Sequence, residues 1–160
     1  MGRVSIFFTV AGFLGFLAVP LSALSESSRD ALILQVLDRY MDGLNALDME
    51  THVATYHFPH FRLAGGELSV WSTPEEAMPI LNVPAEARRK RLRAMLHPEW
   101  YKSIWTKRDI VGESPAKVHV ATRFARLRED GSEIISYDSL YVLTLQDGQW
   151  GIKGRSSFAP

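Results

Sequence analysis

The chain has 160 residues, with 18 Lys and Arg balanced by 18 Asp and Glu, and it carries no formal net charge at pH 7. A content of 46% hydrophobic and 22% charged residues is typical of a folded domain, and this length suits one hydrophobic core rather than two. Because a neutral chain has no overall field to attract a polyanion, we expect no nucleic acid partner.

The N-terminal segment has the composition of an export signal. Arg3 is the only charged side chain before Glu26, and residues 4–19 are almost wholly apolar. Pro20 then breaks any helix that forms there. A charged start followed by an apolar stretch predicts a secretory signal.

The end of this segment suits cleavage by signal peptidase. Ala23 and Ser25 are small residues of the kind that the peptidase recognises, so we predict a signal peptide over residues 1–25 and a single domain over residues 26–160. The domain is then exported, either periplasmic or secreted. The alternative is an uncleaved anchor over residues 4–24, which would be the domain's only contact with a membrane.

The chain contains no cysteine. This excludes disulfides, thiol catalysis and thiolate metal sites, so the core alone must stabilise the domain. His57 and His60 are close in sequence, but Pro59 prevents a continuous helix between them, and zinc needs three or four ligands. We therefore predict no metal site, and we place His57 at a helix end near the last carbonyl groups.

Two helices are predicted at the start of the domain. Residues 27–30 open the first with a hydroxyl cap and an early acid. Its apolar face recurs every three or four residues and consists of Ile33, Leu37, Tyr40, Met41 and Leu44. Asp48 caps a second, shorter helix that runs to Tyr56 and is ended by Pro59.

Two further helices are predicted before the main sheet. Residues 72–76 start one of them, with a hydroxyl cap, a proline and a glutamate in the first turn, and it stops near Asn82. The next spans residues 84–97 and carries a basic run, residues 88–91 with Arg93. Such a helix could bind an anionic membrane surface or an acidic partner, but a solvated basic face is the more ordinary interpretation.

The other elements are predicted to be strands, over residues 60–63, 67–71, 101–111, 117–128, 134–145 and 150–158. Gly65 and Gly66 form the first turn, and the Asp-Gly pairs at residues 130–131 and 147–148 form tight hairpins. Helices followed by a meander predict an α+β domain in which helices cover one face of a curved antiparallel sheet.

This order of elements resembles the nuclear transport factor 2-like superfamily, which includes the SnoaL-like proteins and ketosteroid isomerases. The resemblance is carried by the paired helices from residues 38–40 to Tyr56, the strand over residues 60–63 and the closing hairpin over residues 141–152. It implies a cone-shaped sheet wrapped around the helices and open into a mostly apolar pocket. It also implies members that isomerise, cyclise, dehydrate or only bind, and dimers formed through the outer sheet face.

The resemblance implies a role for Tyr40, at the position where isomerases of this family place a hydroxyl that hydrogen-bonds a substrate oxyanion. A buried core aromatic is the alternative. Counting forward without a gap, the position of the isomerase base falls on Ala64 and that of the second acid near Leu140. Neither residue can exchange a proton, so we do not expect ketosteroid isomerase chemistry.

Strand alternation then predicts the polar lining of the pocket, if Ala64 and Leu140 face inward. The predicted set is Tyr40, His60, Arg62, Arg123 and Asp138. A histidine oriented by an aspartate could act as a base, and an arginine could bind a carboxylate or a phosphate. Alternatively, Asp138 and an arginine form an ion pair that only orders the sheet, and a shift of one residue would turn this set outward.

The sequence also predicts two aromatic residues in the pocket wall and the face of the sheet that forms the dimer. Trp71 and Trp105 are predicted to line the pocket wall. The outer, dimerising face is predicted to carry the residues that alternate with the pocket set, namely Val118, Val120, Thr122 and Phe124.

The predicted function is that of an exported domain that binds a small, partly apolar molecule without a cofactor. The first alternative is an acid/base enzyme of the isomerase, dehydratase or cyclase type, with Tyr40, His60 and Asp138 as catalytic residues. The second is a dimeric interaction module on the same scaffold.

Overall fold

The computed structural model describes the backbone of residues 21–159 and the side chains of residues 27–159. The first half contains the helices α1 (Leu21–Ala46) and α2 (Met49–Val53), the strands β1 (Tyr56–Ala64) and β2 (Glu67–Trp71), the helix α3 (Pro74–Ala77), the 3-10 helix η1 (Pro79–Asn82) and the helix α4 (Ala85–Leu96). The second half consists of the strands β3 (Lys102–Ser114), β4 (Lys117–Leu127), β5 (Glu133–Gln146) and β6 (Gln149–Ser157).

Most of the predicted export segment, residues 1–20, lies outside the described residues. Helix α1 begins at Leu21 rather than near residue 27, so it passes through the predicted cleavage position after Ser25. None of the helices that the structure describes combines the length and the apolarity needed to cross a bilayer.

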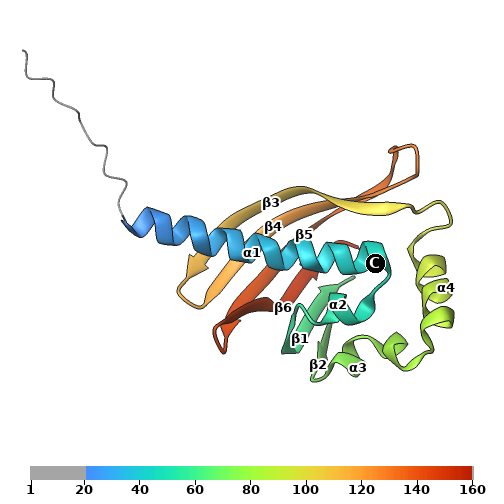
Figure 1. Ribbon diagram of the computed structural model, residues 1–160, viewed down its shortest axis with the longest axis horizontal. Helices are drawn as coiled ribbons and strands as arrows, with labels where there is room; N and C mark the ends of the chain where they lie inside the picture. Colours follow the sequence, from blue (N-terminus) through green and yellow to red (C-terminus); the bar gives the residue numbers. More distant parts are fainter. Residues whose placement is uncertain (1–20, 160) are drawn as a thin grey trace, which may run out of the picture.

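The sheet curves around α1, which lies against its concave face (Figure 1). Its strand order is β2-β1-β6-β5-β4-β3, with β1 parallel to β6 and every other pair antiparallel. The tight turns depend on residues that tolerate a positive φ, as at Asp147 and Gly148 with φ of 50° and 77°. The α+β cone is therefore the observed architecture.

The core lies between α1 and the inner sheet face. Its largest cluster contains Ile33, Val36, Leu37 and Tyr40 from α1 and Val118, Val120, Tyr141, Leu143 and Ile152 from the sheet. A second cluster, built from Leu47, Met49, Leu92 and Trp100, joins α2 to α4 and to the segment before β3.

The predicted dimer face on β4 is wrong. Val118 and Val120 are fully buried, and Thr122 and Phe124 are nearly so, because their side chains face α1. In the opposite register, both valines would be exposed to water. Burying their apolar area is more favourable, and this determines which face of β4 is turned inward.

The predicted helix up to Pro59 is also wrong beyond Val53. Asp48 does cap α2, since its Oδ1 accepts a hydrogen bond of 3.1 Å from the backbone nitrogen of Thr51. However, β1 begins at Tyr56 and pairs in parallel with β6, so sheet hydrogen bonds replace the predicted helical ones. His57 therefore lies on a strand, where its Nδ1 is 2.9 Å from the Oγ1 of Thr144.

Candidate functional site

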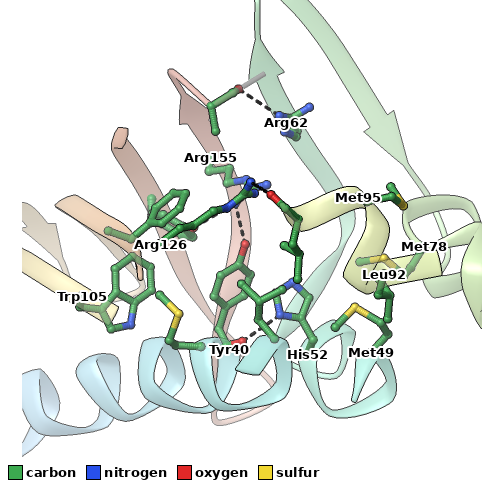
Figure 2. Close-up of a pocket in the computed structure, with 16 residues that line it drawn as sticks. Tyr40, Met49, His52, Arg62, Met78, Leu92, Met95, Trp105, Arg126 and Arg155 are labelled. Atoms are coloured by element: carbon green, nitrogen blue, oxygen red, sulfur yellow. Dashed lines mark hydrogen bonds between the residues drawn. The ribbon is translucent and has the colours of Figure 1, made fainter. Parts of the chain in front are cut away.

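A cavity of about 270 Å³ lies between α1, α2, α4 and the inner face of the sheet (Figure 2). Its apolar wall consists of Met41, Leu44, Met49, Met78, Leu92, Met95, Leu96, Trp105, Phe124 and Ala159. Its polar wall consists of Tyr40, His52, Arg62, Arg126, Tyr141 and Arg155. Of the described residues that line the cavity, none is Asp or Glu. The lining therefore combines positive charge with a large apolar surface.

Arg155 on β6 is the centre of the polar wall. Its Nη1 donates hydrogen bonds to the hydroxyls of Tyr40 at 2.6 Å and Tyr141 at 3.1 Å. Its guanidinium also lies 5.9 Å from the centre of each ring. Burial raises the pKa of Tyr40 to about 12 and also raises that of Tyr141, so both hydroxyls keep their protons at neutral pH. Each hydroxyl accepts from Arg155, and the hydroxyl of Tyr40 also hydrogen-bonds those of Tyr141 and Tyr56.

Two further arginines belong to this wall. The Nη2 of Arg62 donates to the carbonyl oxygen of Ala159 at 3.1 Å, and the Nη1 of Arg126 donates to that of Leu96 at 2.6 Å. The Nε of Arg126 is buried and has no hydrogen-bond partner among the described residues. Burial, followed by the nearby charge of Arg155, lowers the pKa of both side chains. Three guanidiniums therefore line the same cavity.

His52 on α2 lies at the base of the cavity. Its Nδ1 is 2.8 Å from the carbonyl oxygen of Tyr40, and because a carbonyl can only accept, Nδ1 carries the proton. Its Nε2 then accepts from the hydroxyl of Tyr56 at 3.2 Å. Burial lowers the pKa of His52 to about 4, so the ring is neutral at pH 7. Since both ring nitrogens are engaged, His52 is poorly placed to act as a base.

The predicted site residues are divided between several environments. Tyr40, Arg62 and Trp105 line the cavity. His60 lies behind the wall, where its Nδ1 donates to the carbonyl oxygen of Ile152 at 2.9 Å and burial lowers its pKa to about 4. Its ring stacks on Tyr56 with 3.9 Å between centroids and, on the other side, on Trp71 at 6.0 Å. His60 and Trp71 thus belong to an aromatic stack behind the cavity.

Arg123 and Asp138 do not face the cavity, and their predicted place in the pocket is wrong. They are directly opposite each other on β4 and β5, where their side chains are 48% and 56% exposed and form an ion pair of 3.0 Å. Leu140 points to the same outer face. Ser139 and Tyr141 take the inner positions of β5, so the predicted set is displaced by one residue on this hairpin.

Two predicted relationships fail with this register. Asp138 cannot orient His60 as a base, because it lies on the outer face of the sheet and His60 is buried on the inner one. For the same reason, Asp138 does not share a cavity with Arg62.

The basic run on α4 divides into one buried and several exposed side chains. Arg88 pairs with Glu50 on α2 and donates to the carbonyl oxygens of Leu81 at 2.9 Å and Val83 at 3.1 Å. The exposed cations are Arg89, Lys90, Arg91 and Arg93. Arg88 therefore holds α4 against α2 and η1, while the rest of the run faces solvent.

Sequence analysis does not identify His52, Arg126, Tyr141 or Arg155 as site residues. Strand alternation could not find Arg155, because a bulge on β6 places both Ile152 and Arg155 on the inner face although they are three residues apart. Within residues 27–159, no three His, Cys, Asp or Glu side chains converge in a way that could hold a metal ion.

Comparison with known proteins gives the family. The family described as NTF2-like protein (DUF6841) matches residues 27–155, whereas no curated protein matches the chain.

Solved structures support the same fold. An NTF2-like protein of unknown function from Shewanella oneidensis MR-1 has a TM-score of 0.58 at 14% identity, over 81% of this chain and 98% of that one. An NTF2-like protein with a cystatin-like fold from Novosphingobium aromaticivorans has a TM-score of 0.64 at 9% identity, over 91% and 90%. A ketosteroid isomerase-like protein from Erwinia carotovora atroseptica has a TM-score of 0.54 at 17% identity, over 80% and 93%. The family match spans most of the chain, which therefore belongs to the NTF2-like family.

Proposed function

We propose that this protein binds a small, partly apolar anion in its cavity. The observation that carries the proposal is the guanidinium of Arg155, held by the hydroxyls of Tyr40 and Tyr141 on a wall without Asp or Glu. A partly buried cation that lacks a carboxylate loses hydration without gaining an ion pair, and a bound anion offsets that loss. The planar, forked guanidinium suits a carboxylate or a phosphate.

The other half of the cavity suits an apolar group. Met41, Met49, Met78 and Met95 contribute to it together with leucine side chains from α1 and α4. Methionine side chains are flexible and polarisable, so this wall can adapt to chains or rings of different shapes. An amphipathic anion would thus place its charged end at Arg155 and its apolar end against the methionines.

Binding is favoured over acid/base catalysis. The described lining contains no carboxylate, and the one histidine on it, His52, has both ring nitrogens in hydrogen bonds. A general base needs a free lone pair within reach of the proton that it removes. The similarity to a ketosteroid isomerase-like protein is at 17% identity and therefore concerns the scaffold alone.

We also propose a homodimer, through a surface different from the predicted one. The outer face of the sheet carries two adjacent rows of apolar side chains on β5, β1 and β2, which cross β6 at Gly154 and Ser156. This outer apolar strip consists of Phe61, Leu63, Leu68, Val70, Leu140 and Val142. Leu68 and Val70 are 65% and 59% exposed, and a contiguous apolar face of this kind is usually covered by a partner. A second copy would extend the same strip across a two-fold axis.

Export remains part of the proposal. It is supported by the apolar residues 4–19, which follow Arg3 and precede the small residues Ala23 and Ser25. Intact mass of the protein recovered from the cell envelope tests cleavage after Ser25. Recovery of the full-length chain would favour the anchored alternative.

The binding proposal is tested with a matched pair of probes, octanoate and 1-octanol, by calorimetry on the purified protein. We expect octanoate to bind at least about tenfold more tightly, because only octanoate carries a negative charge that can pair with Arg155. Arg155→Met should abolish this preference, whereas Arg123→Met, on the outer face, should preserve it. Equal affinity for the two probes in the unmodified protein would contradict the proposal.

A further inference from the structure

The three guanidiniums of the cavity come from three strands of the same sheet. Arg62 on β1 and Arg155 on β6 are direct neighbours in the parallel register, and Arg126 reaches the cavity from β4 (Figure 2). Like charges directly opposite each other on one face of a sheet repel and destabilise the pair. The sequence nevertheless places two arginines in that position.

Arg126 and Arg155 have no carboxylate partner among the described residues. The lining contains no Asp or Glu, and neither Arg126 nor Arg155 forms an ion pair with any described carboxylate. The titratable groups that share the cavity are Tyr40, Tyr141 and His52, all neutral at pH 7. Arg126 and Arg155 alone therefore bring two positive charges to the cavity, more than one carboxylate can neutralise.

Arg126 supplies a second, independent sign of a missing acceptor. Its Nη1 is used by the carbonyl oxygen of Leu96, but its Nε is buried without a hydrogen-bond partner. Buried polar groups are nearly always hydrogen-bonded, and an unsatisfied charged donor is especially costly. Because Arg126 lines the same cavity as Arg155 and feels its charge, an anion bound at Arg155 would also offset the charge of this guanidinium.

We propose that the charged end of the bound molecule is a dianion, held by Arg155 and Arg126 with Arg62 beside them. This inference rests on the proposed function and narrows its ligand class. Two chemistries provide such a group on an apolar substituent, a phosphate monoester and a malonate-type dicarboxylate. Each offers more oxygens and more charge than a single carboxylate, matching three forked donors from three strands of one sheet.

Octyl probes with different head groups test this by calorimetry. A phosphate monoester has a second pKa of about 6, so octyl phosphate is a dianion at pH 7.5 and mostly a monoanion at pH 5, while octyl sulfate is a monoanion at both. We expect octyl phosphate or octylmalonate to bind at least about tenfold more tightly than octyl sulfate at pH 7.5. For octyl phosphate, this preference should shrink at pH 5. The tighter of the two dianions identifies the chemistry of the head group.

A variant separates this inference from the proposed function. Arg126→Met should weaken binding of the two dianions far more than binding of octyl sulfate and so remove the preference for dianions, and the remaining binding of octyl sulfate shows that the variant is folded. Arg123→Met, on the outer face, should keep the preference. Equal affinity for octyl phosphate, octylmalonate and octyl sulfate in the unmodified protein would overturn the dianion and leave the anion site intact. If none of the three anions binds, both the dianion and the proposed function are wrong.

Discussion

The Nη1 of Arg155 on β6 donates a hydrogen bond of 2.6 Å to the hydroxyl of Tyr40 on α1. The guanidinium of Arg155 therefore joins the sheet to helix α1, which the sheet encloses. This contact lies on the polar wall of the cavity. Substitutions at this contact should affect both binding and folding.

Tyr40→Phe keeps the aromatic ring but removes the hydroxyl. We expect the free energy of unfolding to fall by about 2 kcal/mol, because a hydrogen bond to a charged group is lost, and the affinity for octanoate to fall about fivefold. Chemical denaturation and calorimetry measure the two effects. Tyr101→Phe, at a half-exposed tyrosine before β3, is the control and should change neither. Unchanged affinity in Tyr40→Phe would remove Tyr40 from the site.

Acid should destabilise the protein through His52 and His60. Burial lowers the pKa of each from 6.5 to about 4, so the unfolded chain binds protons that the folded chain excludes. The stabilisation is complete above pH 6.5 and is lost as the pH falls from 6.5 towards 4, by about 3 kcal/mol at most for each histidine. Denaturation at a series of pH values measures this slope, and NMR titration of the imidazoles assigns it. A ring that titrates near pH 6.5 in the folded protein would contradict the prediction.

Arg88 should hold α4 against the rest of the domain. Arg88→Ala removes the pairing with Glu50 and the hydrogen bonds to the carbonyls of Leu81 and Val83, and we expect a loss of about 2 kcal/mol in the free energy of unfolding. Hydrogen exchange should accelerate over α4 in particular, and release of octanoate should be faster, since α4 forms part of the wall. Arg89→Ala, at the exposed neighbouring position, is the matched control. Equal effects of the two substitutions would show that α4 is held by something else.

Gly154 should be intolerant of a side chain. A Cβ at this position would lie 2.3 Å from the ring of Phe61, which crosses β6 on the outer face, so we expect Gly154→Ala to lower the free energy of unfolding by about 2 kcal/mol. Gly112→Ala is the control, because its nearest neighbour would be 4.0 Å away. Thermal or chemical denaturation compares the two. A neutral Gly154→Ala would mean that the aromatic ring moves freely.

The outer apolar strip should mediate dimer formation. Leu63→Asp places a charge within the strip, between β2 and β6, and we expect sedimentation to show a dimer for the unmodified protein and a monomer for this variant. Met95→Asp, at a 76% exposed apolar residue on α4, should leave the dimer intact. A monomeric unmodified protein would disprove the homodimer.

Local signals in the sequence predict most elements of this fold. The cap at Thr73 and the Asp-Gly turns depend on a few neighbouring residues, and the structure contains both. On β1, alternation places Arg62 correctly on the inner face. These features need no knowledge of how distant strands pair.

The pocket depends on register, which the sequence specifies less directly. A gap-free count from Tyr40 turns Leu140 inward, but packing of Val118 and Val120 against α1 turns the β4–β5 hairpin the other way. On β6, the bulge near Ile152 brings Arg155 inward against simple alternation. The residues that the sequence fails to identify are thus those whose direction is decided by long-range packing.

Ala159 lines the cavity, and its carbonyl oxygen accepts a hydrogen bond from Arg62. Ala159, the last described residue, therefore lies in the lining of the cavity rather than at a remote surface. A purification tag fused after this point would begin close to that lining and could compete with the probes described above. Binding measurements should use protein whose C-terminus carries no tag, and a loss of affinity on adding one would report on how close the bound molecule comes to the last strand.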